Sequence, residues 1–467
     1  MDFDTDIEDW RYRREEIMVN SALSRWTMSY FAAALLFFVG AQALMVVGYG
    51  FPSVVVEAPE TLVVVHMVTI GWLSLLMCGA LFQFVPVLIA SPLRGERLVL
   101  PALVCLLAGL GCLLGGFLEL AGTFEMGLPL LAFAAALLPV GFALVAGVLG
   151  RTLWGARLPL PARFVAVGLP SVLVTAILGA LFALVLSGYL PVLADMDLRT
   201  HALPIHIAVG LGGWLSFTAI GVSYRLLPMF MLSPDKARRS SYTAWWTGAV
   251  ALLLIALATP FASLLGTPDM ATSVRMLAVL LGGASLVYYG VDLIFFYRHR
   301  KRRAVELNSR AAQGAFFALA LSAALLLALL ASGTLERHVG ALLYLVAFGW
   351  LSGLGLSQLY KIVPFLTWLE CYGPVMGKKP TPRVQDLVAE PRDRIWFVLY
   401  FLSVTTGAAA LLAEQPGLFR IAAGGSLLAT LAIVTELVLA RRLKNVPQAQ
   451  RSPEGASPPR LFLPRPH

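Results

Sequence analysis

Gly71-Trp72-Leu73-Ser74 is the first of three copies of one apolar motif in this chain. The same four residues recur at 213–216 and 349–352, and in each copy a proline follows the tryptophan by fourteen residues (Pro86, Pro228 and Pro364). Because the 467 residues contain only 10 tryptophans, five matching positions in three copies are not a coincidence. The tryptophans lie 142 and 136 residues apart. This spacing predicts a threefold internal repeat.

The composition is that of a membrane protein. Hydrophobic residues make up 59% of the chain and charged residues 13%. Many apolar runs exceed the roughly 20 residues that span a bilayer as a helix. We therefore expect an all-α polytopic membrane protein with about twelve transmembrane helices, near residues 28–50, 60–89, 96–121, 127–150, 163–187, 201–232, 243–265, 273–297, 311–332, 336–369, 394–414 and 419–440.

The motif falls in the second, sixth and tenth of these helices. The sequence therefore predicts a membrane domain over 28–440, built from three pseudo-symmetric four-helix units at about 28–150, 163–297 and 311–440. A polar amino-terminal arm (1–27) precedes it. The segment 441–467 follows, is rich in proline and lacks apolar periodicity, so we expect a disordered tail.

The net charge of +9 is distributed unevenly among the connections. Lys and Arg gather at the amino-terminal arm and at every second connection, whereas the opposite loops carry at most one Arg each. By the positive-inside rule this bias predicts a bacterial-type inner membrane location with both termini in the cytoplasm. The positive charge therefore indicates orientation in the lipid bilayer, and we expect no nucleic-acid partner.

Histidines are the candidate ligands. The chain has 6, and one precedes each motif tryptophan: His66, His206 and His338, with His201 nearby. Neutral imidazole is a preferred ligand of iron and copper, and ionisable residues inside a membrane tend to be functional. At about 1.5 Å per residue, His66 and His206 form a deep pair, about 9 and 12 Å above their tryptophans. His338 and His201 form a shallower pair, and Tyr344 occupies in the third copy the slot of His66.

Two further patterns leave alternatives open. The glycine before each motif tryptophan, with Gly79, Gly221 and Gly355 farther along, gives a face that suits close helix packing or a flat macrocycle. The eleventh residue after each tryptophan is polar. These residues either reach the membrane surface or pair with an acid such as Asp292 or Glu436, and they are Gln83, Arg225 and Lys361.

The chain resembles subunit I of the heme-copper oxidases, which has twelve helices in three groups of four. The run from Gly79 to Pro86, with its Gly-aromatic-polar-aromatic-Val-Pro ending, is similar to the end of that family's second helix. The architectural resemblance covers about residues 28–440, and the motif resemblance is confined to helices two, six and ten. It implies an oxidase-like fold and b-type heme, one or two, with His66 as the second-helix ligand.

The sequence departs from the family where copper would bind. The family has a tyrosine four residues after its sixth-helix histidine, but Gly210 stands there in this chain. Helix seven, where the family has a histidine pair, contains no histidine. Leu342 and Tyr344 replace the two histidines of helix ten. The resemblance therefore implies a divergent member without the oxygen-reducing copper centre, in which enzyme activity is an open question.

Two functions from different classes follow. The first is a heme-binding respiratory membrane protein for electron transfer or for binding a small gas such as nitric oxide, with a cytochrome or another respiratory subunit as partner. Its ligands come from His66, His206, His338, His201 and Tyr344. The second is a copper or heme transporter that uses imidazoles with nearby thioethers and thiols, such as Met67, Met77, Cys78, Met229 and Met231. A structural subunit without cofactor is the third alternative.

Overall fold

A computed structural model describes residues 26–125, 127–192, 198–264, 268–451, 459 and 462, without the side chains of 198–200, 262–264 and 268. Within these residues the protein is helical and contains no strand. Twelve helices there are long and apolar enough to cross a membrane. The twelve predicted spans are thus confirmed, with ends that differ by a few residues. The expected amino-terminal arm lies almost entirely outside the described residues.

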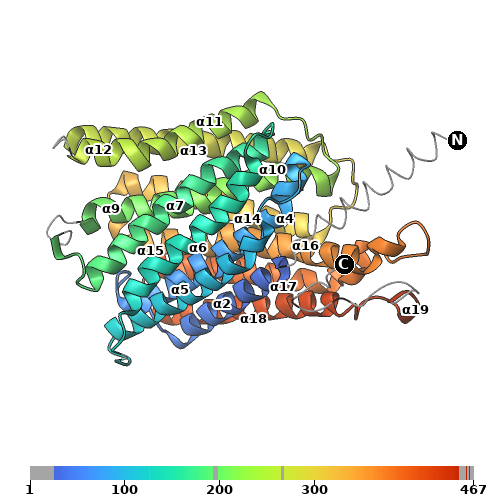
Figure 1. Ribbon diagram of the computed structural model, residues 1–467, viewed down its shortest axis with the longest axis horizontal. Helices are drawn as coiled ribbons and strands as arrows, with labels where there is room; N and C mark the ends of the chain where they lie inside the picture. Colours follow the sequence, from blue (N-terminus) through green and yellow to red (C-terminus); the bar gives the residue numbers. More distant parts are fainter. Residues whose placement is uncertain are drawn as a thin grey trace.

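Nine of the spans lack the motif; eight of them contain no π-helical segment, and the seventh span is interrupted by η4 (Leu254–Ala258). They are α2 (Thr27–Val47), α5 (Val99–Leu120), α6 (Leu130–Leu153), α7 (Leu160–Leu186), α11 and α12 (Arg239–Leu253 and Thr259–Leu264), α13 (Pro268–Arg298), α14 (Leu307–Ser332), α17 (Glu390–Leu412) and α18 (Pro416–Arg441). Figure 1 shows them as a bundle of long helices, with α5, α6 and α7 side by side. The first and last spans, α2 and α18, pack together and close the bundle.

The other three spans carry the motif, and we call them the motif helices. Each is an α-helix interrupted by a π-helical segment: α3–η1–α4, α9–η3–α10 and α15–η5–α16. Between 61% and 67% of each motif span is buried, against 22% to 44% of the other nine. The motif helices therefore form the centre of the bundle. Their segments are Pro59–His66, Met67–Ser74 and Leu75–Ile89, then Leu198–Ile207, Ala208–Phe217 and Thr218–Met231, then Leu335–Tyr344, Leu345–Ser352 and Gly353–Tyr372.

A closed ring of three hydrogen bonds joins the motif helices. The indole Nε1 of Trp72 donates to Ser352 Oγ at 2.8 Å, that of Trp214 to Ser74 Oγ at 2.9 Å, and that of Trp350 to Ser216 Oγ at 3.2 Å. Each motif copy thus donates to one copy and accepts from the other. We call this set the Trp–Ser ring, and it explains why tryptophan and serine recur two residues apart.

In each motif helix a π-helical segment coincides with the motif, and two of the three motif serines bond back into their own helices. Ser74 Oγ donates to Thr69 O at 2.8 Å, and Ser352 Oγ donates to Ala347 O at 2.7 Å, in each case five residues earlier. A π-helical turn is rare and occurs mostly at functional or packing sites. Here a π-helical turn, which holds more residues than an α-helical turn, changes the direction in which the side chains before each tryptophan point.

The glycine that opens each motif allows a neighbouring helix to approach. A Cβ atom on Gly71 would lie 2.6 Å from Phe37 of α2, one on Gly213 would lie 2.6 Å from Ser171 of α7, and one on Gly349 would lie 2.8 Å from Ala318 of α14. The glycine face is therefore occupied by side chains of packed helices. The structure supports the packing interpretation of these glycines.

The Trp–Ser ring leads to a stability prediction. The Ser74→Ala substitution removes the acceptor of the buried Trp214 indole and the donor to Thr69 O, so we expect the free energy of unfolding to fall by about 1–2 kcal/mol. The measurement is thermal unfolding of the purified protein in detergent. Ser322→Ala is the matched control, because that buried hydroxyl bonds only to Ala318 O of its own helix. Equal effects of the two variants would contradict a special role of the ring.

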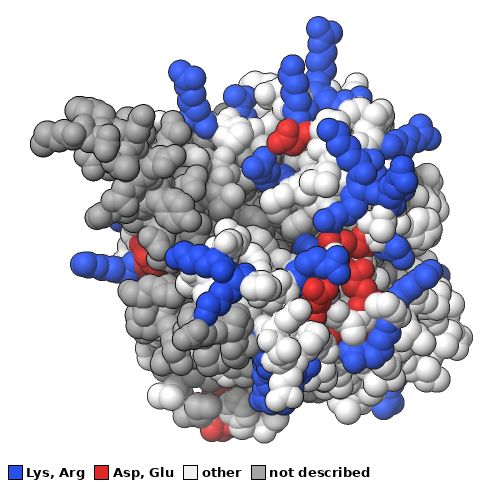
Figure 2. All heavy atoms as spheres, turned by 90° about the vertical axis from the view of Figure 1, so that its right-hand side faces the viewer, with Lys and Arg blue, Asp and Glu red and all other residues white. Residues whose placement is uncertain are grey.

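Basic residues gather at the end of the bundle where α4, α10 and α16 finish, which we call the basic end. Figure 2 views this end and shows Lys and Arg side chains spread over it, with a few acids between them. Figure 2 thus shows the predicted gathering of Lys and Arg at this end. The residues come from the connections between spans and include Arg94, Arg97, Arg157, Lys236, Arg239, Arg300, Lys301, Arg303, Lys378, Lys379 and Lys444.

The segment after α18 differs from the expected tail as far as Arg451. Leu443 and Val446 are 3% and 1% exposed and pack with Cys371 and Tyr372 at the end of α16. The Tyr372 hydroxyl donates to Arg451 O at 3.0 Å. These two apolar residues anchor the segment, so the disorder expected from residue 441 does not apply up to 451. Most of the chain beyond lies outside the described residues.

Candidate functional site

His66 is the last residue of α3, directly before the π-helical segment η1. Its Nδ1 lies 2.8 Å from Leu62 O, one turn earlier. Its ring is half-buried and tilts against Phe117 of α5, with 5.2 Å between ring centroids. The carbonyl bond favours the tautomer in which Nδ1 carries the proton, which leaves the Nε2 lone pair available to a ligand.

His206 is held in the same manner, but by a neighbouring helix. Its Nδ1 lies 3.0 Å from Thr175 O of α7. Phe182 of α7 meets the imidazole edge-on at 5.7 Å, and a Cβ atom on Gly179 would lie 3.2 Å from its Cε1. The glycine therefore makes room for the imidazole against α7. As for His66, no described residue gives His206 Nε2 a hydrogen bond.

The two imidazoles lie next to the π-helical segments η1 and η3, which contact each other where the first and second motif helices meet. His66 contacts α5 and His206 contacts α7, and both of these helices flank α6, so the pair faces one wall of three helices. These are the two residues that the sequence grouped as the deep pair, and the helices that carry them are neighbours in the structure. We call them the histidine pair.

The other candidate ligands lie elsewhere. Tyr344 is buried and packs against Phe348 and against Phe419 of α18, with its hydroxyl directed at Gly407 of α17. His338 lies in the first turn of α15, which packs against α14 and α17. His201 is exposed in the first turns of α9. The third motif helix therefore contributes no ligand next to the histidine pair. Tyr344 packs against α17 and α18, and His338 lies on α15, which packs against α14 and α17.

The donor set limits the kinds of metal site. In the part of the chain that the structure describes, no three His, Cys, Asp or Glu side chains are grouped to hold a metal ion. Zinc sites in proteins use three or four protein ligands. Heme iron needs only one or two, because the macrocycle supplies four nitrogens. Two anchored imidazoles with aromatic neighbours therefore suit heme better than zinc.

The polar residues after the motif tryptophans have specific partners. Lys361 Nζ lies 2.7 Å from Glu306, and Arg225 Nη1 lies 3.1 Å from Asp235. Pairing with an acid was one of the two alternatives for these residues. The partners are Glu306 and Asp235, not the suggested Asp292 and Glu436. Gln83 is buried near the same end.

Asp292 belongs to a buried cluster of its own at the basic end. Its carboxylate is 0% exposed and accepts hydrogen bonds from Tyr224, Ser240, Ser241 and Arg238. Glu436 pairs with Arg392 and also accepts from Asn445. Because these acids bond to several neighbouring side chains, we interpret them as structural anchors. Their partners lie far away along the chain, so no local sequence pattern identifies them.

Comparison with known proteins does not assign this chain to a family. No protein-family model matches this chain, and no curated protein matches it. The site is therefore interpreted from its own residues.

Proposed function

We propose that this chain is a heme-binding integral membrane protein in which His66 and His206 are the two axial ligands, and that it transfers electrons. The observation that carries the proposal is the shared anchoring of the two imidazoles: each Nδ1 lies at a backbone carbonyl, and each Nε2 is left for a metal. The carbonyls fix the tautomer and the orientation of both rings, as second-shell partners of metal ligands do.

The surroundings of the histidine pair support the same proposal. Phe117 and Phe182 give the pair apolar neighbours that exclude water. The Trp–Ser ring stabilises the positions of both histidines, because its Trp214–Ser74 hydrogen bond joins the two helices that carry them. A heme with two imidazole ligands supplies one-electron chemistry and leaves no open iron position for a gas. The pairing therefore favours electron transfer over gas binding.

The proposal includes an oxidase-like arrangement of three four-helix units, with the basic end in the cytoplasm. The closed Trp–Ser ring supports threefold symmetry, and the charge at one end supports the orientation. The pairing departs from the resemblance in one respect. The oxidases pair helix two with helix ten, whereas here helix two is paired with helix six.

Copper handling has less support from the positions of the sulfur ligands. Met77 lines a cavity between the motif helices, Cys78 is fully buried, and Met229 is 44% exposed at the surface of the bundle. These side chains do not gather around the histidine pair.

An absorption spectrum tests the proposal. Protein expressed with heme supplied and purified in detergent should show a Soret band and, when reduced, the sharp low-spin bands of a b-type cytochrome. Carbon monoxide should leave the reduced spectrum unchanged, because both axial positions are filled. A shift with carbon monoxide would instead favour a single ligand and gas binding. A preparation without any Soret band would refute the heme assignment.

A further inference from the structure

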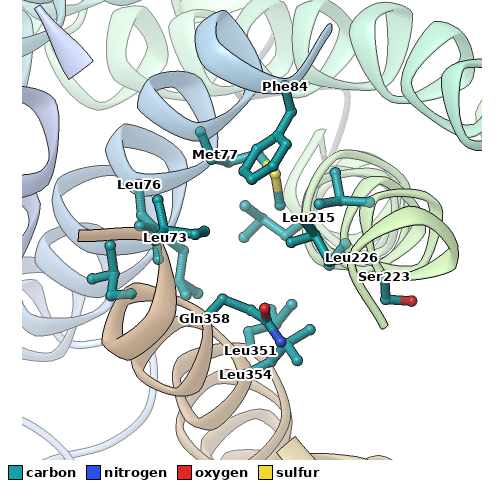
Figure 3. A pocket seen from close by; sticks show the side chains of 16 residues that line it. Leu73, Leu76, Met77, Phe84, Leu215, Ser223, Leu226, Leu351, Leu354 and Gln358 are labelled. Atoms are coloured by element: carbon teal, nitrogen blue, oxygen red, sulfur yellow. The ribbon is translucent and has the colours of Figure 1, made fainter. Parts of the chain in front are cut away.

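A small cavity lies between the three motif helices, on the basic-end side of the Trp–Ser ring (Figure 3). Its volume is about 70 Å³. Leu73, Leu215 and Leu351, the residues directly after the three ring tryptophans, line it nearest the ring. The third residue of the motif therefore separates the ring from the cavity.

The lining repeats in layers as the motif does. Phe84, Leu226 and Ile362, each twelve residues after its tryptophan, form one layer. The layer eight residues after each tryptophan consists of Ala80, Val222 and Gln358. The third copy thus places a polar amide where the other two copies have apolar side chains. Ser223 is the other polar residue of the lining.

The Gln358 amide has no partner. The residue is 9% exposed, and both its Nε2 and its Oε1 are buried without a hydrogen bond. Figure 3 shows the side chain crossing from α16 into the cavity, toward Leu226 and Ser223 of α10. Ser223 Oγ is already engaged with Ile220 O and the Tyr289 hydroxyl. An unpaired buried amide is unfavourable, and native structures rarely contain one without a reason.

We propose that this cavity binds one small neutral molecule that has a hydrogen-bonding group at one end and an apolar body, with Gln358 as its anchor. A charged ligand does not fit, because no charged side chain lines the wall. A cavity of about 150 Å³ holds benzene, so a cavity of about 70 Å³ admits a ligand of only a few heavy atoms. Water satisfies the site less well, since an ordered water needs two to four polar partners and the rest of the wall is apolar.

Ethanol is the probe, and methionine NMR is the readout. Met77 lines the cavity and carries a methyl group that can be labelled with ¹³C, while Met229, 44% exposed at the bundle surface, reports effects of ethanol on the membrane. In protein reconstituted in nanodiscs, ethanol should shift the Met77 signal saturably and should shift Met229 only in proportion to concentration. The readout does not depend on heme.

Two variants test the assignment. Gln358→Leu keeps the volume and removes the amide, and should weaken ethanol binding about tenfold, the usual size of one well-placed hydrogen bond. Ala80→Leu fills the cavity and should abolish the Met77 shift. Three results would overturn the proposal: no saturable shift of Met77 in the unmodified protein, unchanged affinity in Gln358→Leu, or a response of Met77 to xenon without one to ethanol, which would mark a purely apolar void.

Discussion

Replacing His206 with alanine should lower the heme content of the purified protein by more than about tenfold. Loss of an outer-shell partner of a metal ligand typically costs about 10–100-fold in metal affinity, and His206 is proposed as a ligand itself. The space left against Gly179 and Phe182 should admit free imidazole. Imidazole added during heme loading should therefore restore part of the heme and the low-spin spectrum. The measurement is the ratio of heme to protein, with spectra before and after rescue.

His66→Ala should give the same loss, since both ligands are proposed to bind one iron. His299→Ala is the matched control, because that histidine stacks on Phe295 at the basic end, with 4.1 Å between ring centroids. It should keep the full heme content. A protein whose heme content and spectrum are unchanged in both His66→Ala and His206→Ala does not use the histidine pair, and the site assignment would then be wrong.

Replacing Asp292 with alanine should have the largest effect on stability. The substitution leaves Arg238 without its carboxylate partner and leaves the buried hydroxyls of Tyr224 and Ser241 without an acceptor. Breaking a buried ion pair from one side costs about 3–5 kcal/mol. The side chain of Arg238 is 35% exposed and regains some water, so we expect about 3 kcal/mol, the lower end of that range.

The matched control for Asp292 is Asp235→Ala. Asp235 also pairs with an arginine at the basic end, but the side chains of Arg225 and Asp235 are 42% and 65% exposed. Exposed pairs contribute about 0–1 kcal/mol. The comparison uses the unfolding temperature of both variants in the same detergent. If Asp235→Ala were as destabilising as Asp292→Ala, burial would not be what makes the Asp292 cluster important.

The helices were predictable because their signal is local. Twenty apolar residues in a row have few alternatives to a membrane helix, and the charged connections mark the ends. The interruption of the motif helices by π-helical segments was not predictable. Ser74 and Ser352 bond five residues back while they accept from another helix, and the segments are apolar on all sides, so their sequence shows no helical period.

The histidine pair was predictable in part. Counting residues from the motif tryptophans placed His66 and His206 at similar depth, and in the structure the helices that carry them contact each other. The same count did not show toward which neighbouring helix each histidine points. The contacts of His66 with Phe117 and of His206 with Phe182 and Gly179 were therefore missed. Gly179 carries one usable signal, since a glycine inside a membrane helix often marks a close approach. Gln358 was missed because it lies eight residues after the tryptophan, where the other copies are apolar.

The sequence by itself determined the class of protein, the number of spans and the three helices that carry the repeated motif. Hydrophobicity and an internal repeat are properties of the linear sequence, so they can be recognised without knowing which residues are in contact. Only the tertiary structure decided what the motif does: its glycine admits a neighbouring helix, its tryptophan and serine close a ring, and its leucine lines a cavity. The bonds of the ring join residues more than 130 positions apart, as Trp350 and Ser216 are. In a bilayer such contacts are fixed by packing and hydrogen bonds that no local pattern encodes.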